Sequence, residues 1–220
     1  MPKAKVYSWK NPKPLTTAVV LIMAFDALWA LSDIFIQASW GERSNFTGIP
    51  PANWSLPQVL LWLHDILAFA VLAGGLVAIF WILRASKNAS VLKGRNLENS
   101  PWFAALWWYV IPFMSLFKPL ESISEIWDAS APDARSRKEG SPVLAVWWLC
   151  TIAGGVMGWV LRFFNGAWPA IVMQSVFTIV QCLAFAYIAQ RIGEMQIEKQ
   201  MVIVFSDTEA PMSVLERVTG

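Results

Sequence analysis

Residues 102–127 read WFAALWWYVIPFMSLFKPLESISEIW, and this stretch decides how the chain folds. It begins as an apolar, tryptophan-rich segment of the kind that enters a membrane. Pro112 interrupts it, because proline lacks a backbone donor and breaks a helix. Lys118-Pro119 follow after about 17 residues, fewer than the roughly 20 that a helix needs to cross ~30 Å of hydrocarbon. We therefore predict that residues 101–117 enter the membrane and return.

The second half of the stretch has the pattern of a short amphipathic helix. Apolar Leu120, Ile123 and Trp127 recur at nearly helical spacing. The polar residues on the other side are Glu121, Ser122, Glu125 and Asp128. Such a helix suits the membrane interface, so we predict that residues 101–130 form one re-entrant or interfacial element.

The composition of the whole chain is that of a membrane protein. Of 220 residues, 56% are hydrophobic and 15% are charged, whereas soluble domains average about a quarter charged. Four apolar segments are long enough to cross a bilayer: residues 15–37, 56–83, 143–161 and 167–188. We predict an all-α integral membrane bundle of four transmembrane helices, plus the Trp/Pro-rich element at 101–130.

The distribution of Lys and Arg predicts the orientation. Four basic residues lie in each of the segments 1–14, 84–100 and 118–141, but only one in 38–57 and one in 162–166. Four crossings place every basic segment in the cytoplasm, as the positive-inside tendency requires. We expect a cytoplasmic N-terminal segment at 1–14, a membrane domain at 15–188 and a cytoplasmic C-terminal tail at 189–220, helical at first and then mobile. Five crossings, with 101–117 spanning, remain the alternative.

Polar residues inside the predicted spans form the candidate binding site. They are Asp26, Asp33, His64, Asp65 and Gln174. The first two spans run antiparallel, so Asp33 and His64 should lie at a similar depth; Gln174 begins a polar stripe that continues to Thr178 and Gln181. Charged groups in hydrocarbon are costly and often functional. The hypothesis is a proton- or cation-responsive site, and the alternative is that these groups only join helices.

Other motifs predict less about chemistry. Gly154 and Gly158 form a G-x-x-x-G pair, which serves either an oligomer interface or packing within one bundle. Cys150 and Cys182 lack any metal-ligand or redox spacing, and no nucleotide-binding or hydrolase motif is present. We assign no catalytic residue, metal or cofactor. No cluster of basic residues suggests nucleic acid as a partner.

A family resemblance rests on the order of residues in the opening stretch. The positions that carry it are Trp102, Trp107-Trp108, Pro112, Leu116-Phe117-Lys118-Pro119 and Glu125-Ile126-Trp127. Over roughly residues 60–190 the chain resembles bacterial membrane proteins grouped as domain of unknown function 4328. Lys118 stands where arginine is more usual, and lysine lacks the fork that makes bidentate contacts. The resemblance implies a multi-pass protein of the bacterial inner membrane, and it supplies no activity.

Three functions from different classes fit this pattern. The first is an accessory or interaction protein in the lipid bilayer, whose re-entrant element docks another membrane protein or a second copy of the chain. The second is a small proton- or cation-responsive transporter or channel-like protein that uses the intramembrane Asp and His residues. The third is a lipid-active enzyme with Lys118 and Glu125 at the interface.

Overall fold

The structure, a computed structural model, describes residues 7–40, 56–111, 113–163 and 168–219; side chains are left out at several positions within these ranges, among them 63–72, 108 and 206–219. All regular structure in these ranges is helical. The elements are α1 Lys13–Trp40, α2 Leu56–Lys93, the π-helix η1 Phe103–Trp107, α3 Trp108–Val110, the 3-10 helix η2 Met114–Leu116, α4 Lys118–Ser130, α5 Ala134–Phe163 and α6 Trp168–Thr219. The prediction of an all-α protein is confirmed.

Four of these helices, α1, α2, α5 and α6, are long and apolar enough to cross a membrane. The qualifying stretches are Lys13–Phe35, Ala73–Lys93, Ala134–Leu161 and Pro169–Phe205. Many large apolar side chains on these helices are exposed, for example Leu21, Phe35 and Trp159. That exposure suits a lipid environment, which accepts apolar side chains but no unpaired backbone. The predicted bundle of four membrane helices is confirmed.

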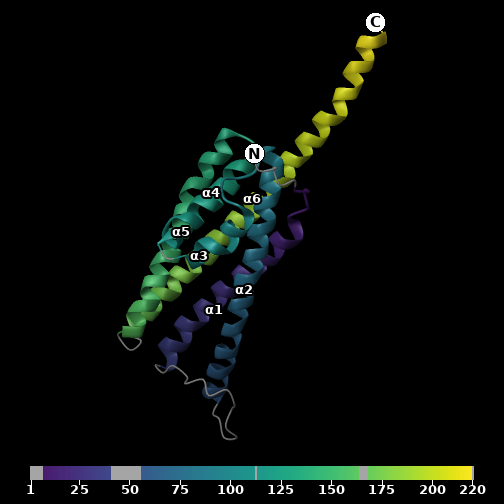
Figure 1. Ribbon diagram of the computed structural model, residues 1–220. Coiled ribbons are helices and arrows are strands. Elements are labelled where there is room, and N and C mark those ends of the chain that lie inside the picture. Colours follow the sequence, from purple (N-terminus) through teal and green to yellow (C-terminus); the bar gives the residue numbers. More distant parts are fainter. Residues whose placement is uncertain (1–6, 41–55, 112, 164–167, 220) are drawn as a thin grey trace.

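Two of the helices extend further than the apolar pattern indicates. α2 continues past residue 83 to Lys93, where Gly94 (φ +66°) adopts the left-handed conformation that commonly ends a helix. α6 continues past residue 188 to Thr219 and projects beyond the bundle (Figure 1). Ion pairs and hydrogen bonds between residues three and four apart, such as Arg191–Glu194 and Gln190–Glu194, support its polar part.

The tightest core lies at one end of the bundle, which we call the inner end because the basic segments 84–100 and 118–141 are there. α6 packs along both α1 and α5 (Figure 1). α2 packs on α1, α4 and η1. Trp81, Ile123, Trp127, Ile188 and Ile192 are almost fully buried at this end. Here the chain packs like a soluble domain, and the four long helices extend from it toward the other, outer end.

A buried hydrogen-bond network, the inner polar network, holds this end together. The Gln196 amide on α6 donates to Ala85 O (2.9 Å) and to Ser130 Oγ (3.1 Å). The Asn88 amide on α2 donates to Gln196 Oε1 (3.2 Å) and to Lys10 O (2.7 Å). Lys10 N donates in turn to Asn88 Oδ1 (3.1 Å). The network therefore joins the N-terminal segment, α2, α4 and α6, and satisfied buried networks of this kind specify one arrangement.

The re-entrant element begins and ends at the inner end. Glu125 on α4 accepts hydrogen bonds from Glu98 N (2.7 Å) and Asn99 N (3.1 Å), residues that lie just before the element begins. Between these points the chain forms only η1, α3 and η2, and Phe113 has φ +61°. No single helix runs through the described residues of this segment, and residues 98–99 lie beside Glu125, as an element that returns to its starting side requires. Its entry into the membrane stays a prediction. Pro112 itself lies outside the described residues.

α4 returns alongside α5 and is held by two indole groups. Trp127 Nε1 donates to Ser136 O (2.9 Å), and the Trp127 ring lies directly against Gly140 of α5. One level further along α5, Trp148 Nε1 donates to Leu116 O (2.8 Å), which satisfies a carbonyl in the broken part of the element. A re-entrant backbone is tolerated only where protein or water meets its polar groups, and Trp148 meets one of them.

The turn between α4 and α5 is closed by two further polar contacts. Lys199 Nζ on α6 donates to Ala129 O (2.7 Å), near the C-terminal end of α4, where a cation is favourable. Asp133 Oδ1 accepts from Ser136 N (2.7 Å) and so caps α5. Hydrogen bonds from the backbone N–H and the side chain of Ser136 hold the pKa of Asp133 below its usual value. Ser122 of α4 is also buried, although the sequence pattern assigned it to the polar side.

Candidate functional site

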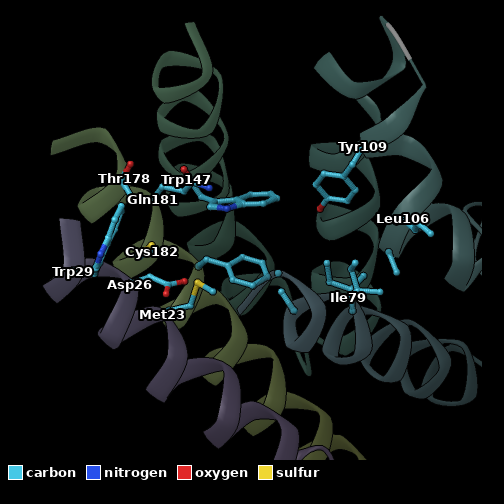
Figure 2. A pocket seen from close by; sticks show the side chains of 15 residues that line it. Met23, Asp26, Trp29, Ile79, Leu106, Tyr109, Trp147, Thr178, Gln181 and Cys182 are labelled. Carbon is cyan, nitrogen blue, oxygen red and sulfur yellow. The ribbon is translucent and has the colours of Figure 1, made fainter. Parts of the chain in front are cut away.

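A cavity of about 430 Å³ lies among α1, α2, α5, α6 and the re-entrant element, and fifteen residues line it (Figure 2). Met23, Asp26 and Trp29 reach it from α1, while Ile79 of α2 and Tyr109 of α3 approach from the other side (Figure 2). The re-entrant element bounds the cavity because η1 packs on α2 and the Tyr109 ring lies 6.4 Å from that of Trp148 on α5. The element therefore helps to shape the cavity.

Most of the cavity wall is apolar or aromatic. Trp147 and Phe185 lie with ring centroids 5.4 Å apart, on α5 and α6, and both line the cavity. The polar side chains in the wall are few, chiefly Asp26, Thr178 and Gln181. An apolar space with a small number of polar groups is the usual character of a small-molecule site.

Asp26 is the most unusual residue of the cavity. Only 4% of it is exposed, and its Oδ1 is buried without a hydrogen-bond partner among the residues that the structure describes. Its carboxylate points from α1 toward the other lining side chains (Figure 2). More than nine in ten buried polar atoms have a partner, so an unpaired carboxylate oxygen needs an explanation.

The second oxygen of Asp26 lies over Gly74 of α2. A Cβ added at Gly74 would lie 2.8 Å from Asp26 Oδ2 and 2.7 Å from Ile22 Cγ2. A side chain at residue 74 would therefore force Ile22 and Asp26 of α1 to shift. At the neighbouring Gly75, which lines the cavity, an added Cβ would meet nothing within 4 Å.

The structure divides the predicted polar cluster. Asp33 lies further out on α1, where its Oδ2 accepts from Ser175 Oγ (3.2 Å) on α6. Gln174 lies against α5, its Nε2 3.5 Å from a Cβ built on Gly158. Neither residue lines the cavity with Asp26. The structure therefore does not bring Asp26, Asp33 and Gln174 into one site.

The side chains of His64 and Asp65 lie outside the described residues, so their pairing with Asp33 stays a prediction. Their backbone is part of α2. At 1.5 Å per residue, His64 is about 15 Å along the helix axis from Gly74, the residue beside Asp26. This distance places the predicted His64 pair at another level of the bundle.

The G-x-x-x-G pair faces the chain's own α6. A Cβ on Gly154 would meet Phe177 Cβ at 3.6 Å, and a Cβ on Gly158 would meet the Gln174 amide at 3.5 Å. Both are ordinary van der Waals distances. The pair therefore contributes to packing within one bundle.

Two charged residues of the family resemblance, Glu125 and Lys118, form hydrogen bonds and ion pairs within the chain. Glu125 receives the hydrogen bonds of Glu98 and Asn99 and lies 3.5 Å from Lys93 Nζ. Lys118 Nζ bonds to Glu121 (2.7 Å) on the same helix. Lys118 and Glu125, the two residues of the lipid-active hypothesis, are therefore both engaged in ion pairs.

The remaining signature positions shape the element or face outward. Pro119 is buried in the first turn of α4, whereas Trp102 and Trp107 are about half exposed. The side chain of Trp108 and all of Pro112 are outside the described part of the chain.

Sequence reasoning missed several residues of the cavity. Gly75, Tyr109 and Trp147 line it, and none stood out as polar or as part of a motif with a known role. The available signal was indirect, since a broken, shallow element between two long helices leaves space beside them. The polar stripe on the fourth span did predict that Thr178 and Gln181 share a face, and both residues line the cavity.

Comparison with known families gives one match. Residues 47–192, about two thirds of the chain, match the family described as a domain of unknown function, DUF4328. No curated protein matches the sequence, and no solved structure matches the chain.

Proposed function

The chain belongs to the family of domain of unknown function 4328, whose description names no activity, so we propose a function from the cavity. We propose that this membrane protein binds an apolar or amphipathic small molecule beside Asp26. One observation carries this proposal. The Asp26 carboxylate is buried in the wall of a cavity and one of its oxygens has no hydrogen-bond partner among the described residues.

The dimensions and chemistry of the cavity support binding. Its volume of about 430 Å³ lies within the roughly 300–1,000 Å³ of typical ligand sites. An unsatisfied buried polar group costs about 1–3 kcal/mol, more if it is charged, and a ligand with a donor group would remove that cost. Ligand binding would therefore be favoured at Asp26 itself as well as along the apolar wall.

The membrane and the orientation are part of the same proposal. We place the protein in the bacterial inner membrane with the inner end and both termini in the cytoplasm. The support is the concentration of Lys and Arg in segments 1–14, 84–100 and 118–141. Arg135, whose side chain is 89% exposed, offers a labelling position. A cysteine at residue 135 should react with an impermeant maleimide only after the cytoplasmic side is opened; reaction in intact cells would refute this orientation.

Filling the cavity tests the binding function. Gly75→Trp projects a large side chain into the cavity, whereas Gly155→Trp places the same side chain on α5 away from it; a Cβ at either glycine meets nothing within 4 Å. Immobilised protein in a maltoside detergent is titrated with three tritiated probes: tetraphenylphosphonium, tetraphenylborate and triphenylmethanol. At least one probe should bind saturably to the wild type and to Gly155→Trp but not to Gly75→Trp. Gly75→Leu provides a smaller filling if the tryptophan variant does not fold.

Two results would refute the binding function. Failure of all three probes to saturate the wild type would refute the proposal. Equal binding of a probe by Gly75→Trp and the wild type would place that probe elsewhere and refute it too. Elution volume and circular dichroism of each variant show whether it is folded.

An accessory role is the second candidate, and exposed aromatic side chains favour it. Phe113 and Phe117, both in the re-entrant element, are 81% and 69% exposed, and Phe205, where α6 leaves the bundle, is 68% exposed. Such side chains face either lipid or another membrane protein, including a second copy of the chain. A single 24.7 kDa species without a co-purifying protein in mild detergent would argue against this role.

A measurement of flux across reconstituted vesicles distinguishes a transport function from a binding function. A transporter that uses Asp26 would move a cation or proton across reconstituted vesicles, and a binding or accessory protein would not. Flux unchanged by Asp26→Asn would remove Asp26 from any transport function.

A further inference from the structure

We infer that the ligand of this cavity is a cationic amphiphile, a protonated amine or an onium ion on an apolar body, with its positive group against Asp26. This inference rests on the proposed binding function and adds the chemical class of the ligand. Three independent features of the cavity carry it: the acid without a partner, the sign of the charge in the wall, and the aromatic lining.

The charge of the wall selects a cation. Asp26 is the charged residue among those that line the cavity, and no Lys, Arg or His lines it in the described ranges. None of the residues in the described ion pairs lines the cavity; Lys93–Glu125 and Arg191–Glu139, for example, lie at the inner end. An anionic ligand would meet an acid and no basic group, whereas a cation would supply the missing partner of Asp26 Oδ1.

Two neighbouring polar groups can also accept hydrogen bonds from a ligand. The Thr178 hydroxyl uses its proton on Gln174 O (2.9 Å), so it offers its lone pairs to the cavity. Gln181 adds a side-chain amide to the same wall, whose oxygen accepts and whose nitrogen donates. A ligand head with N–H groups matches acceptors of this kind better than a carboxylate or a phosphate does.

The aromatic lining suits the same ligand. Trp29, Tyr109 and Trp147 line the cavity from three different elements (Figure 2). Faces of such rings attract cations, most strongly where water is excluded, and aromatic cages are a common way to hold ammonium groups. The apolar remainder of the wall, such as Ile79 and Met23, takes the hydrocarbon part of the ligand.

The experiment compares probes of one shape but different charge. Tetraphenylphosphonium is a cation, tetraphenylborate is its anionic counterpart, and triphenylmethanol is a neutral relative. Their affinities are measured on immobilised wild-type protein, with resin in the same detergent as the background. We expect tetraphenylphosphonium to bind at least tenfold more tightly than either other probe.

Asp26→Asn removes the charge with little change in shape, so it should weaken tetraphenylphosphonium at least tenfold and leave triphenylmethanol within about twofold. Asp33→Asn is the matched control, because Asp33 is also an acid in α1 but bonds to Ser175 away from the cavity. That variant should retain the cation preference.

The two levels of the proposal fail in different ways. If triphenylmethanol or tetraphenylborate binds as tightly as the cation, or if Asp26→Asn leaves the cation preference intact, the cationic class is wrong while the binding function stands. If no probe saturates the wild type, the binding function itself fails. The probe comparison on the wild type alone decides the class even if Asp26→Asn does not fold.

Discussion

Replacing Gly140 by alanine should weaken the contact that holds the re-entrant element against α5. Gly140 is buried, and a Cβ there would lie 2.2 Å from Trp127 Cε2 and 2.3 Å from Trp127 Nε1. Non-bonded carbon atoms prefer about 3.5–4.0 Å. The indole cannot move away freely, because it is 1% exposed and its Nε1 donates to Ser136 O at 2.9 Å. α4 and α5 must therefore separate, or the indole must give up that hydrogen bond.

The size of the effect follows from opposing contributions. Alanine improves helix propensity over glycine by up to about 1 kcal/mol. Overpacking of a closed site costs about 1–3 kcal/mol, and a weakened buried hydrogen bond adds about 1 kcal/mol. We expect the Gly140→Ala variant to lose about 1–3 kcal/mol of unfolding free energy.

Unfolding by sodium dodecyl sulfate in mixed micelles, followed by circular dichroism, measures this loss. Gly155→Ala is the control, because its Cβ would meet nothing within 4 Å and only the propensity gain applies. Gly140→Ala combined with Trp127→Leu should lose less than the two single changes together, since the smaller side chain removes the clash. A Gly140→Ala variant as stable as the Gly155→Ala control would refute this account of the contact.

Three other changes test neighbouring parts of the fold. Gln196→Leu removes the centre of the inner polar network and leaves the buried Asn88 amide with one partner fewer. It should lower the unfolding free energy by about 2–4 kcal/mol in the same assay, and a loss below ~0.5 kcal/mol would contradict the network's role. Hydrogen bonds lower the pKa of Asp133 in the folded protein, so the ionised Asp133 carboxylate stabilises the fold. This contribution to the unfolding free energy is complete above the unfolded pKa of ~3.9 and is lost as the pH falls through the lower folded value. Asp133→Asn still caps the helix but cannot titrate, so its stability should vary less than that of the wild type below about pH 4, and identical pH profiles would contradict this. Gly74→Ala should lower the unfolding free energy by about 1–3 kcal/mol, because the added methyl contacts α1, whereas Gly75→Ala should leave it unchanged or raise it. The reverse order of stability would contradict the close approach of α1 to α2 at Gly74.

The re-entrant element shows how far sequence reasoning reached. Its short apolar length, Pro112 and the basic residues that follow it predicted a segment that returns, and the hydrogen bonds that Glu98 N and Asn99 N donate to Glu125 place its two ends together. Those signals are local, because length, proline and loop charge act on the segment that carries them. The same reasoning identified Asp26 as a costly residue in a span.

The cavity and the inner polar network could not be predicted in the same way. Asn88 and Gln196 are ordinary polar residues in the sequence, and only the packing of α2 beside α6 buries them together. Likewise, nothing in the sequence distinguishes Asp26, which lines a cavity, from Asp33, which bonds to Ser175. The two acids have the same chemistry, and the neighbouring helix determines which of them keeps an unpaired oxygen.

The sequence by itself determined that this is an all-α membrane bundle with four long apolar helices, because crossing a bilayer requires long apolar helices. Pro112 and the early Lys118 only favoured a returning element over a fifth crossing. Only the tertiary structure decided where the polar residues lie relative to one another. That arrangement depends on the close approach of α1 to Gly74, the contact of Trp127 with Gly140 and the space beside Tyr109. Those are contacts between segments far apart in the chain, which helical periodicity does not specify.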